Sequence, residues 1–146
     1  MHLNIPALLV CSVVSLALGF VWFSILFGKR YGCEADSEAR KPTAEEKKAR
    51  AGMMGRAFSI YIAGSVVTAW AYAVCLNLWR LAAPGHAPDD LGAAAAFSLL
   101  LWAGFFAPFA VGKVIWMGKS WAVAAIEASY EFVRIGLMLL ILWYWR

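Results

Sequence analysis

The sequence predicts an all-α integral membrane protein, with four transmembrane helices in a bundle and a short cytoplasmic helix in the first loop. Of its 146 residues, 63% are hydrophobic and only 15% are charged. Soluble domains typically carry about 25% charged residues. Four apolar stretches are each long enough to cross a bilayer, and aromatic residues gather at their ends, as expected of anchors at the membrane interface.

The predicted spans cover about 5–27, 57–79, 92–112 and 121–145. Each holds about 20 mostly apolar residues, the length that a helix rising ~1.5 Å per residue needs to cross the hydrocarbon core. The first span lacks the basic leading segment of a signal peptide, and its apolar run is too long, so we expect it to be retained. The length of the chain favours one membrane domain over residues 1–146.

The loop charges predict the orientation. The stretch between the first two spans carries Lys29, Arg30, Arg40, Lys41, Lys47, Lys48, Arg50 and Arg56. The loop at 81–90 carries no Lys or Arg. The positive-inside rule therefore places the first loop in the cytoplasm and both termini outside, in a bacterial inner membrane. The net charge is +4, and because the basic residues are concentrated in this loop, the charge indicates a membrane rather than a nucleic-acid partner.

The first loop predicts a short helix that starts at about 44 and runs into the second span. Thr43 and Glu46 form a capping-box pattern, and Glu46 and Arg50 are spaced for an ion pair on one helix face. Two interpretations of its basic residues stay open: contact with anionic lipid head groups, or control of topology by a solvated helix. The candidates for lipid contact are Lys47, Lys48, Arg50 and Arg56.

Small residues predict where the helices pack closely, because close packing drives helix association in lipid. Cys11, Ser15 and Gly19 form a stripe at a spacing of four in the first span, and Gly64 lies in the second. Pro108 removes a backbone donor and is expected to bend the third span. A bundle of this size has little room for an enclosed pathway, which favours a homo-oligomer.

The stretch "EASYEFVR" in the fourth span holds the candidate functional residues. Glu127, Glu131 and Arg134 recur at i, i+4 and i+7, so they share one helix face with Tyr130. Counting ~1.5 Å per residue from the inner end puts Glu131 about 15 Å deep, near the middle of the membrane. An ionised group there costs about 2.5–3.5 kcal/mol, so such residues are candidates for function.

Three interpretations of this cluster stay open. Arg134 most naturally neutralises Glu131, which leaves Glu127 in excess. The cluster is then a proton or cation site of a small transporter or channel-like protein, with Glu131 as the responsive group and Glu127 as relay or second ligand. Alternatively, it is a buried ion-pair network that holds helices or subunits together. In the third interpretation Arg134 contacts a lipid phosphate.

The sequence lacks the motifs of the common enzyme and metal sites. It has no Walker loop, no HExxH, no nucleophile elbow, and no Cys and His residues at the spacing of metal ligands. We therefore expect no enzymatic activity, no cofactor and no metal site, and the bilayer as the main partner.

Two stretches resemble a bacterial membrane family that is catalogued as domain of unknown function 1761. "ALGFVWFSILFGKRYG" at 17–32, after an early Asn4, is similar to the start of that family. "LWAGFF" resembles its Trp-x-Gly-Phe span. The matching positions in the first stretch are Gly19, Trp22, Phe23, Ser24, Phe27, Gly28 and Lys29. The resemblance implies four spans and no known activity. The family has an Asn near the position of Glu127, so the acidic cluster departs from its pattern.

Overall fold

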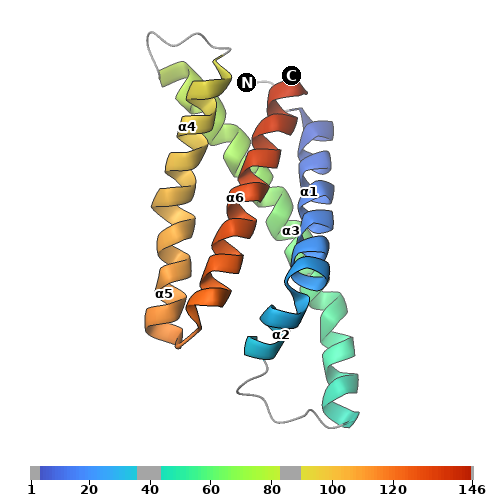
Figure 1. The fold of residues 1–146 in the computed structure, drawn as a ribbon. Helices are drawn as coiled ribbons and strands as arrows, with labels where there is room; N and C mark the ends of the chain where they lie inside the picture. Colours follow the sequence, from blue (N-terminus) through green and yellow to red (C-terminus); the bar gives the residue numbers. More distant parts are fainter. Residues whose placement is uncertain (1–3, 36–43, 83–89, 146) are drawn as a thin grey trace.

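The computed structural model describes residues 4–35, 44–82 and 90–145, with side chains described outside 32–35 and 44–58. These residues are all-helical and contain no strand (Figure 1). The elements are α1 (Ile5–Phe20), η1 (Val21–Leu26), α2 (Gly28–Ala35), α3 (Ala44–Ala82), α4 (Leu91–Leu101), η2 (Trp102–Phe106), α5 (Ala107–Met117) and α6 (Trp121–Tyr144). The segments η1 and η2 are single π-helical stretches that continue α1 and precede α5.

Three helical stretches are long and apolar enough to cross a membrane: Ile5–Leu26, Ser59–Ala82 and Leu91–Met117. They correspond to the first three predicted spans. Helix α6 has 24 residues and matches the fourth predicted stretch in length. It is not among the three because of its charges. Any stretch of α6 that is long enough to cross a membrane contains three charged residues, Glu127, Glu131 and Arg134.

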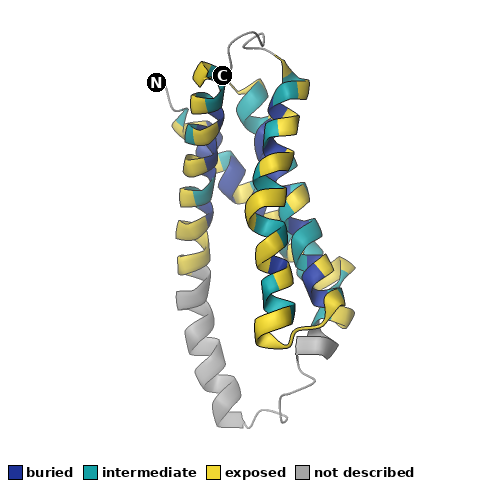
Figure 2. Cartoon of the chain, turned by 90° about the vertical axis from the view of Figure 1, so that its left-hand side faces the viewer, coloured by how far each residue is buried: buried dark blue, intermediate teal, exposed yellow. Residues whose placement is uncertain are grey.

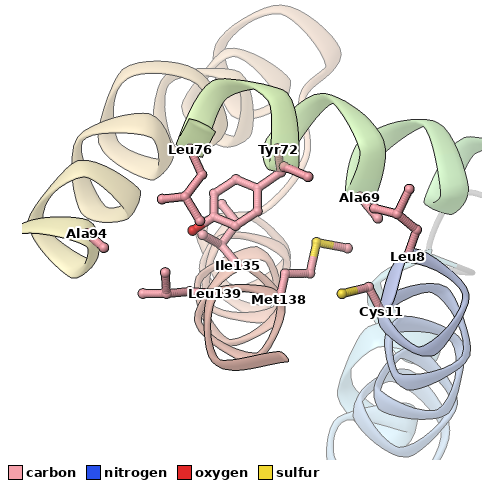
Figure 3. Close-up of a cluster of buried hydrophobic side chains, with 10 residues drawn as sticks. Leu8, Cys11, Ala69, Tyr72, Leu76, Ala94, Ile135, Met138 and Leu139 are labelled. Carbon is pink, nitrogen blue, oxygen red and sulfur yellow. The ribbon is translucent and has the colours of Figure 1, made fainter. Parts of the chain in front are cut away.

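Helix α6 lies at the centre of the fold, where it packs against α1 on one side and against α4 and α5 on the other (Figure 1). Helix α3 crosses the bundle and packs mainly on α1. The core between them includes Leu76, whose side chain points from α3 toward α6, and Met138, whose side chain points toward Cys11 of α1 (Figure 3). The described outer faces are largely exposed and carry large apolar side chains, as on a surface that faces lipid (Figure 2).

Short polar residues set where the helices begin. The side chains of Asn4, Asp90 and Ser120 each accept a hydrogen bond from a backbone N–H in the first turn of α1, α4 and α6. Helix α5 ends at Gly118, whose φ of 64° is a left-handed conformation that glycine adopts without strain. The resulting turn is short, so α5 and α6 run antiparallel and adjacent.

Asn4 also connects the beginning and the end of the described chain. Its Nδ2 donates a hydrogen bond of 3.1 Å to the backbone oxygen of Trp145, so residues 4 and 145 lie at the same end of the fold (Figure 1). A chain whose ends meet in this way passes along the bundle an even number of times. The two described termini thus agree with α6 being a fourth pass.

Several local predictions are confirmed and others are wrong. A helix does begin at Ala44, and it continues without a break to Ala82, whereas Thr43 of the proposed capping box lies outside the described residues. Helix α2 was not predicted. The π-helical segment η2 ends just before Pro108, which lies in the first turn of α5, where its missing N–H costs least. Gly64 is exposed, and a Cβ there would meet nothing within 4 Å, so it marks no close contact.

Candidate functional site

The polar face of α6 is directed into the bundle. Tyr130 and Arg134 are buried, while Glu127 and Glu131 are partly buried. Because α6 is central, the residues on this face meet side chains from α1, α2, α3 and α5. The helical spacing predicted that the four side chains share a face, and the structure confirms it.

Glu131 and Arg134 form an ion pair along α6. Glu131 Oε2 lies 2.5 Å from Arg134 Nη2, and the exposed fraction of the Arg134 side chain is only 9%. The contact is an ion pair without aligned hydrogen-bond geometry. Arg134 faces Cys11 and Ser15 of α1 across a void that has no room for a water molecule. Its Nε is buried and has no hydrogen-bond partner among the described residues. The Arg134 side of the pair is therefore dry and closely packed.

Glu127 has partners on two other helices. Its Oε2 lies 2.6 Å from Lys113 Nζ of α5, and its Oε1 accepts a hydrogen bond of 2.9 Å from the hydroxyl of Tyr31 on α2. The short turn at Gly118 places Lys113 opposite Glu127. Burial, followed by the hydrogen bond and the negative charge of Glu127, raises the pKa of Tyr31 to about 12. Tyr31 thus keeps its proton and remains a donor to Glu127 across the neutral range.

A chain of hydroxyl groups lies beside Glu131. The hydroxyl of Tyr130 donates a hydrogen bond of 3.1 Å to the backbone oxygen of Ser15. The hydroxyl of Tyr61 lies 2.6 Å from the hydroxyl of Tyr130. Because a hydroxyl has one hydrogen, Tyr61 must be the donor in the second bond. A Cβ at Gly19 would lie 3.3 Å from the Tyr130 hydroxyl and 3.4 Å from that of Tyr61. Glycine at this position of α1 leaves the space that both hydroxyl groups use.

Two tryptophans hold the backbone of α6 around Glu127. Trp22 Nε1 of η1 donates to the oxygen of Ile126 at 3.1 Å, and Trp102 Nε1 of η2 donates to the oxygen of Ala128 at 2.8 Å. Both tryptophans lie in π-helical segments, which often occur at functional sites because they redirect side chains. The Glu127 backbone is thus held from both flanking helices.

A cavity of about 280 Å³ connects these groups. It lies between η1, α3, η2, α5 and α6. Its lining includes both carboxylates of the cluster, Lys113 and a set of aromatic rings. The rings belong to Phe23, Tyr61, Phe106, Phe109 and Tyr130.

The charges of the site balance. Glu127 and Glu131 supply two negative charges, and Lys113 and Arg134 supply two positive charges. The two cations differ in freedom. Arg134 is packed dry against α1, whereas the Lys113 side chain is 26% exposed and carries its ammonium on a flexible stem. The Glu127 carboxylate can therefore exchange its counter-ion more easily than the Glu131 carboxylate can.

The model of the family described as "Protein of unknown function (DUF1761)" matches residues 6–143. The chain belongs to the DUF1761 family. The comparison with curated proteins and the comparison with solved structures find no match. Membership in DUF1761 confirms the resemblance seen in the sequence. The family description names no activity, so the function of this member has to be argued from its site.

The stretch at 17–32, which carries the resemblance to the family, builds part of the site. Gly19 makes room for the two tyrosine hydroxyls, and Trp22 bonds to α6 beside Glu127. Phe23 packs between two tyrosines, with its ring centroid 5.0 Å from those of Tyr31 and Tyr130. The motif thus lines and supports the cavity, a role that the sequence analysis did not assign to it.

The pairing of Arg134 with Glu131 is confirmed, but the expectation that Glu127 is left over is wrong. Glu127 is paired with Lys113 and Tyr31, and neither of these residues nor Tyr61 was among the predicted site residues. The signal for Lys113 was its place at the end of "GFFAPFAVGK", close in sequence to the turn before α6. The tyrosines gave no sequence signal, because their approach depends on how α2 and α3 pack.

The proposed lipid contacts are not tested. Lys47, Lys48, Arg50 and Arg56 lie in the first part of α3, where the structure describes the helix but not the side chains. Among the described residues, no group of three His, Cys, Asp or Glu side chains is placed to hold a metal ion.

Proposed function

We propose that this DUF1761 protein is a four-span protein of the bacterial inner membrane, with both termini outside and the basic first loop in the cytoplasm. Three helices are apolar enough to cross, and the bond between Asn4 and Trp145 supports an even number of passes, because it places both residues at the same end of the bundle. Helix α6 is the fourth span in this proposal. Its charges are directed into the bundle and are paired, which lowers the cost of placing them in a bilayer.

Within this topology, the protein acts as a small transporter or channel-like protein whose cavity responds to protons or cations. One observation carries the proposal: two carboxylates from α6 line a cavity of about 280 Å³ instead of packing against apolar side chains. Carboxylates inside a membrane protein that face a cavity are characteristic of ion and proton pathways.

The roles of the two carboxylates differ in this proposal. Glu127 is the exchangeable group, because Lys113 can withdraw on its flexible stem and leave the carboxylate to a proton or a cation. Glu131 is the second carboxylate of the same cavity, and its charge is held by the fixed Arg134. The other titratable groups that face the pair are the hydroxyls of Tyr31 from α2, Tyr61 from α3 and Tyr130 from α6 itself.

The dry packing of Arg134 favours a second candidate function. If the Glu131–Arg134 pair only holds α6 in register against α1, the protein is a structural or interaction protein of the membrane. The lipid contacts of α3 and the formation of a homo-oligomer stay predictions in either case.

Reconstitution into proteoliposomes distinguishes the two functions. With a pH-sensitive dye in the lumen and an imposed cation gradient, we expect the wild-type protein to change the luminal pH and Glu127→Gln to abolish the change. Lys119→Gln is the matched control, because Lys119 is exposed in the turn before α6 and does not line the cavity. Absence of any change with the wild type, together with loss of assembly in Glu127→Gln, would instead support the structural function.

A further inference from the structure

The lining of the cavity is aromatic as well as acidic. Five of its lining residues carry aromatic rings, and they come from η1, α3, η2, α5 and α6. Ring faces carry negative potential and attract cations, most strongly when water is excluded. A cavity that combines several rings with two carboxylates is therefore suited to a positively charged ligand that also has an apolar surface.

Lys113 shows how such a ligand is held. Its ammonium lies 2.6 Å from Glu127 Oε2 and 4.8 Å from the centroid of the Phe109 ring. The ammonium of the chain itself thus has a carboxylate on one side and a ring face on another. This is the environment in which proteins bind alkylated ammonium groups.

An inorganic cation fits this lining less well. Hard cations such as Ca²⁺ take 6–8 oxygen ligands. The lining of this cavity offers two carboxylates and two tyrosine hydroxyls, and both carboxylates are already paired. A quaternary ammonium has no N–H groups to satisfy, so rings and one negative charge suffice. The volume of about 280 Å³ also lies near the lower end of ligand sites, which suits a small ion.

We propose that this cavity binds a small organic ammonium ion of the choline type, which displaces Lys113 from Glu127 and lies against the rings of Phe106 and Phe109. The inference rests on the proposed function, since it names the class of cation that the cavity takes. The ammonium group belongs either to a free quaternary ammonium ion or to a lipid head group that enters the bundle from the membrane.

Calorimetric titration of the purified full-length protein in detergent micelles tests the charge requirement without any variant. The probes are choline and its uncharged isostere 3,3-dimethylbutan-1-ol. We expect choline to bind at least ten-fold more tightly. Equal affinity for the two probes, or no binding of choline, overturns the proposal.

Two variants test the placement of the ligand. Phe106 lines the cavity, whereas its neighbour Phe105 is 70% exposed and does not. Phe106→Leu should weaken choline binding about five-fold, the usual value of one ring contact, and Phe105→Leu should leave it unchanged. Lys113→Met removes the competing ammonium and should strengthen binding. Equal effects of the two phenylalanine variants, or loss of binding in a folded Lys113→Met protein, contradict the placement.

Two further comparisons separate the outcomes. Weaker binding of choline in phosphatidylcholine nanodiscs than in phosphatidylglycerol nanodiscs assigns the lipid head group as the source, and equal binding assigns a free quaternary ammonium ion. If proteoliposomes show a response to protons or inorganic cations that Glu127→Gln abolishes, but choline does not bind, the ammonium inference fails and the proposed function stands. If the proteoliposomes show no such response and choline does not bind, the ammonium inference and the proposed function are both overturned.

Discussion

Replacing Glu131 by Gln should destabilise the protein more than replacing its partner Arg134 by Met. In Glu131→Gln the guanidinium stays charged, because arginine does not lose its proton in proteins, and it stays in a site where its side chain is only 9% exposed. In Arg134→Met the carboxylate that remains can take up a proton and become neutral. The group left without its partner therefore costs more free energy in Glu131→Gln than in Arg134→Met.

The magnitude follows from the geometry. At 2.5 Å and an effective dielectric constant of about 20, the Coulomb attraction is roughly 7 kcal/mol. Desolvation of both groups offsets much of it, and measured losses on breaking buried pairs are about 3–5 kcal/mol. We expect Glu131→Gln to lower the free energy of unfolding by about 3–5 kcal/mol and Arg134→Met by about 1–3 kcal/mol. The double variant should cost less than the sum of the two single variants.

Unfolding in mixed micelles with increasing SDS, followed by far-UV circular dichroism, measures these free energies. The double-mutant cycle gives the coupling between the two side chains. Losses below about 1 kcal/mol for both single variants, or strict additivity, would refute the view that the pair is buried and closely coupled. The expected loss of stability also makes Glu131→Gln alone a poor test of transport, since loss of activity in that variant also reports loss of structure.

The remaining predictions concern α6, α2 and the core. Trp22→Phe and Trp102→Phe each remove one hydrogen bond to α6 and should cost about 1 kcal/mol in the same assay, whereas Trp116→Phe, at a residue 86% exposed, should stay within about 0.5 kcal/mol. The pKa of Tyr31 is raised to about 12, so its contribution to stability is complete below its ordinary pKa of about 10 and is lost as the pH rises through 12. The difference between wild type and Tyr31→Phe should therefore shrink over that range, and a constant difference would contradict the pairing with Glu127. Leu76→Ala should cost about 1–2 kcal/mol, less than in a soluble core because lipid also solvates the side chain, while Leu81→Ala, 84% exposed, should have little effect; equal losses would show that the core of Figure 3 does not pack as described.

Local signals predicted the parts of the site that lie on one helix. The spacing of Glu127, Glu131 and Arg134 placed them on one face, because helical geometry depends only on distance along the chain. The pairing of Glu131 with Arg134 followed from the same geometry. The stripe of Cys11, Ser15 and Gly19 predicted the face of α1 that α6 contacts, because only small residues let two helices approach closely.

Contacts between helices could not be predicted in this way. Lys113 meets Glu127 because Gly118 takes a left-handed conformation and turns α5 back along α6. Tyr61 reaches Tyr130 because α3 crosses the bundle at an angle that no local pattern records. Gly64 shows the reverse case, in which a small residue is exposed instead of packed.

The sequence by itself thus determined an all-helical chain with apolar helices of membrane-spanning length and one charged face, because hydropathy and helical period are local properties. Only the tertiary structure decided that this face is electrically balanced, that Lys113 and Tyr31 complete it, and that it opens into an aromatic cavity. Those features depend on which side chains of separate helices come within a few ångströms. The packing of whole helices sets that proximity, and spacing along the chain does not encode it.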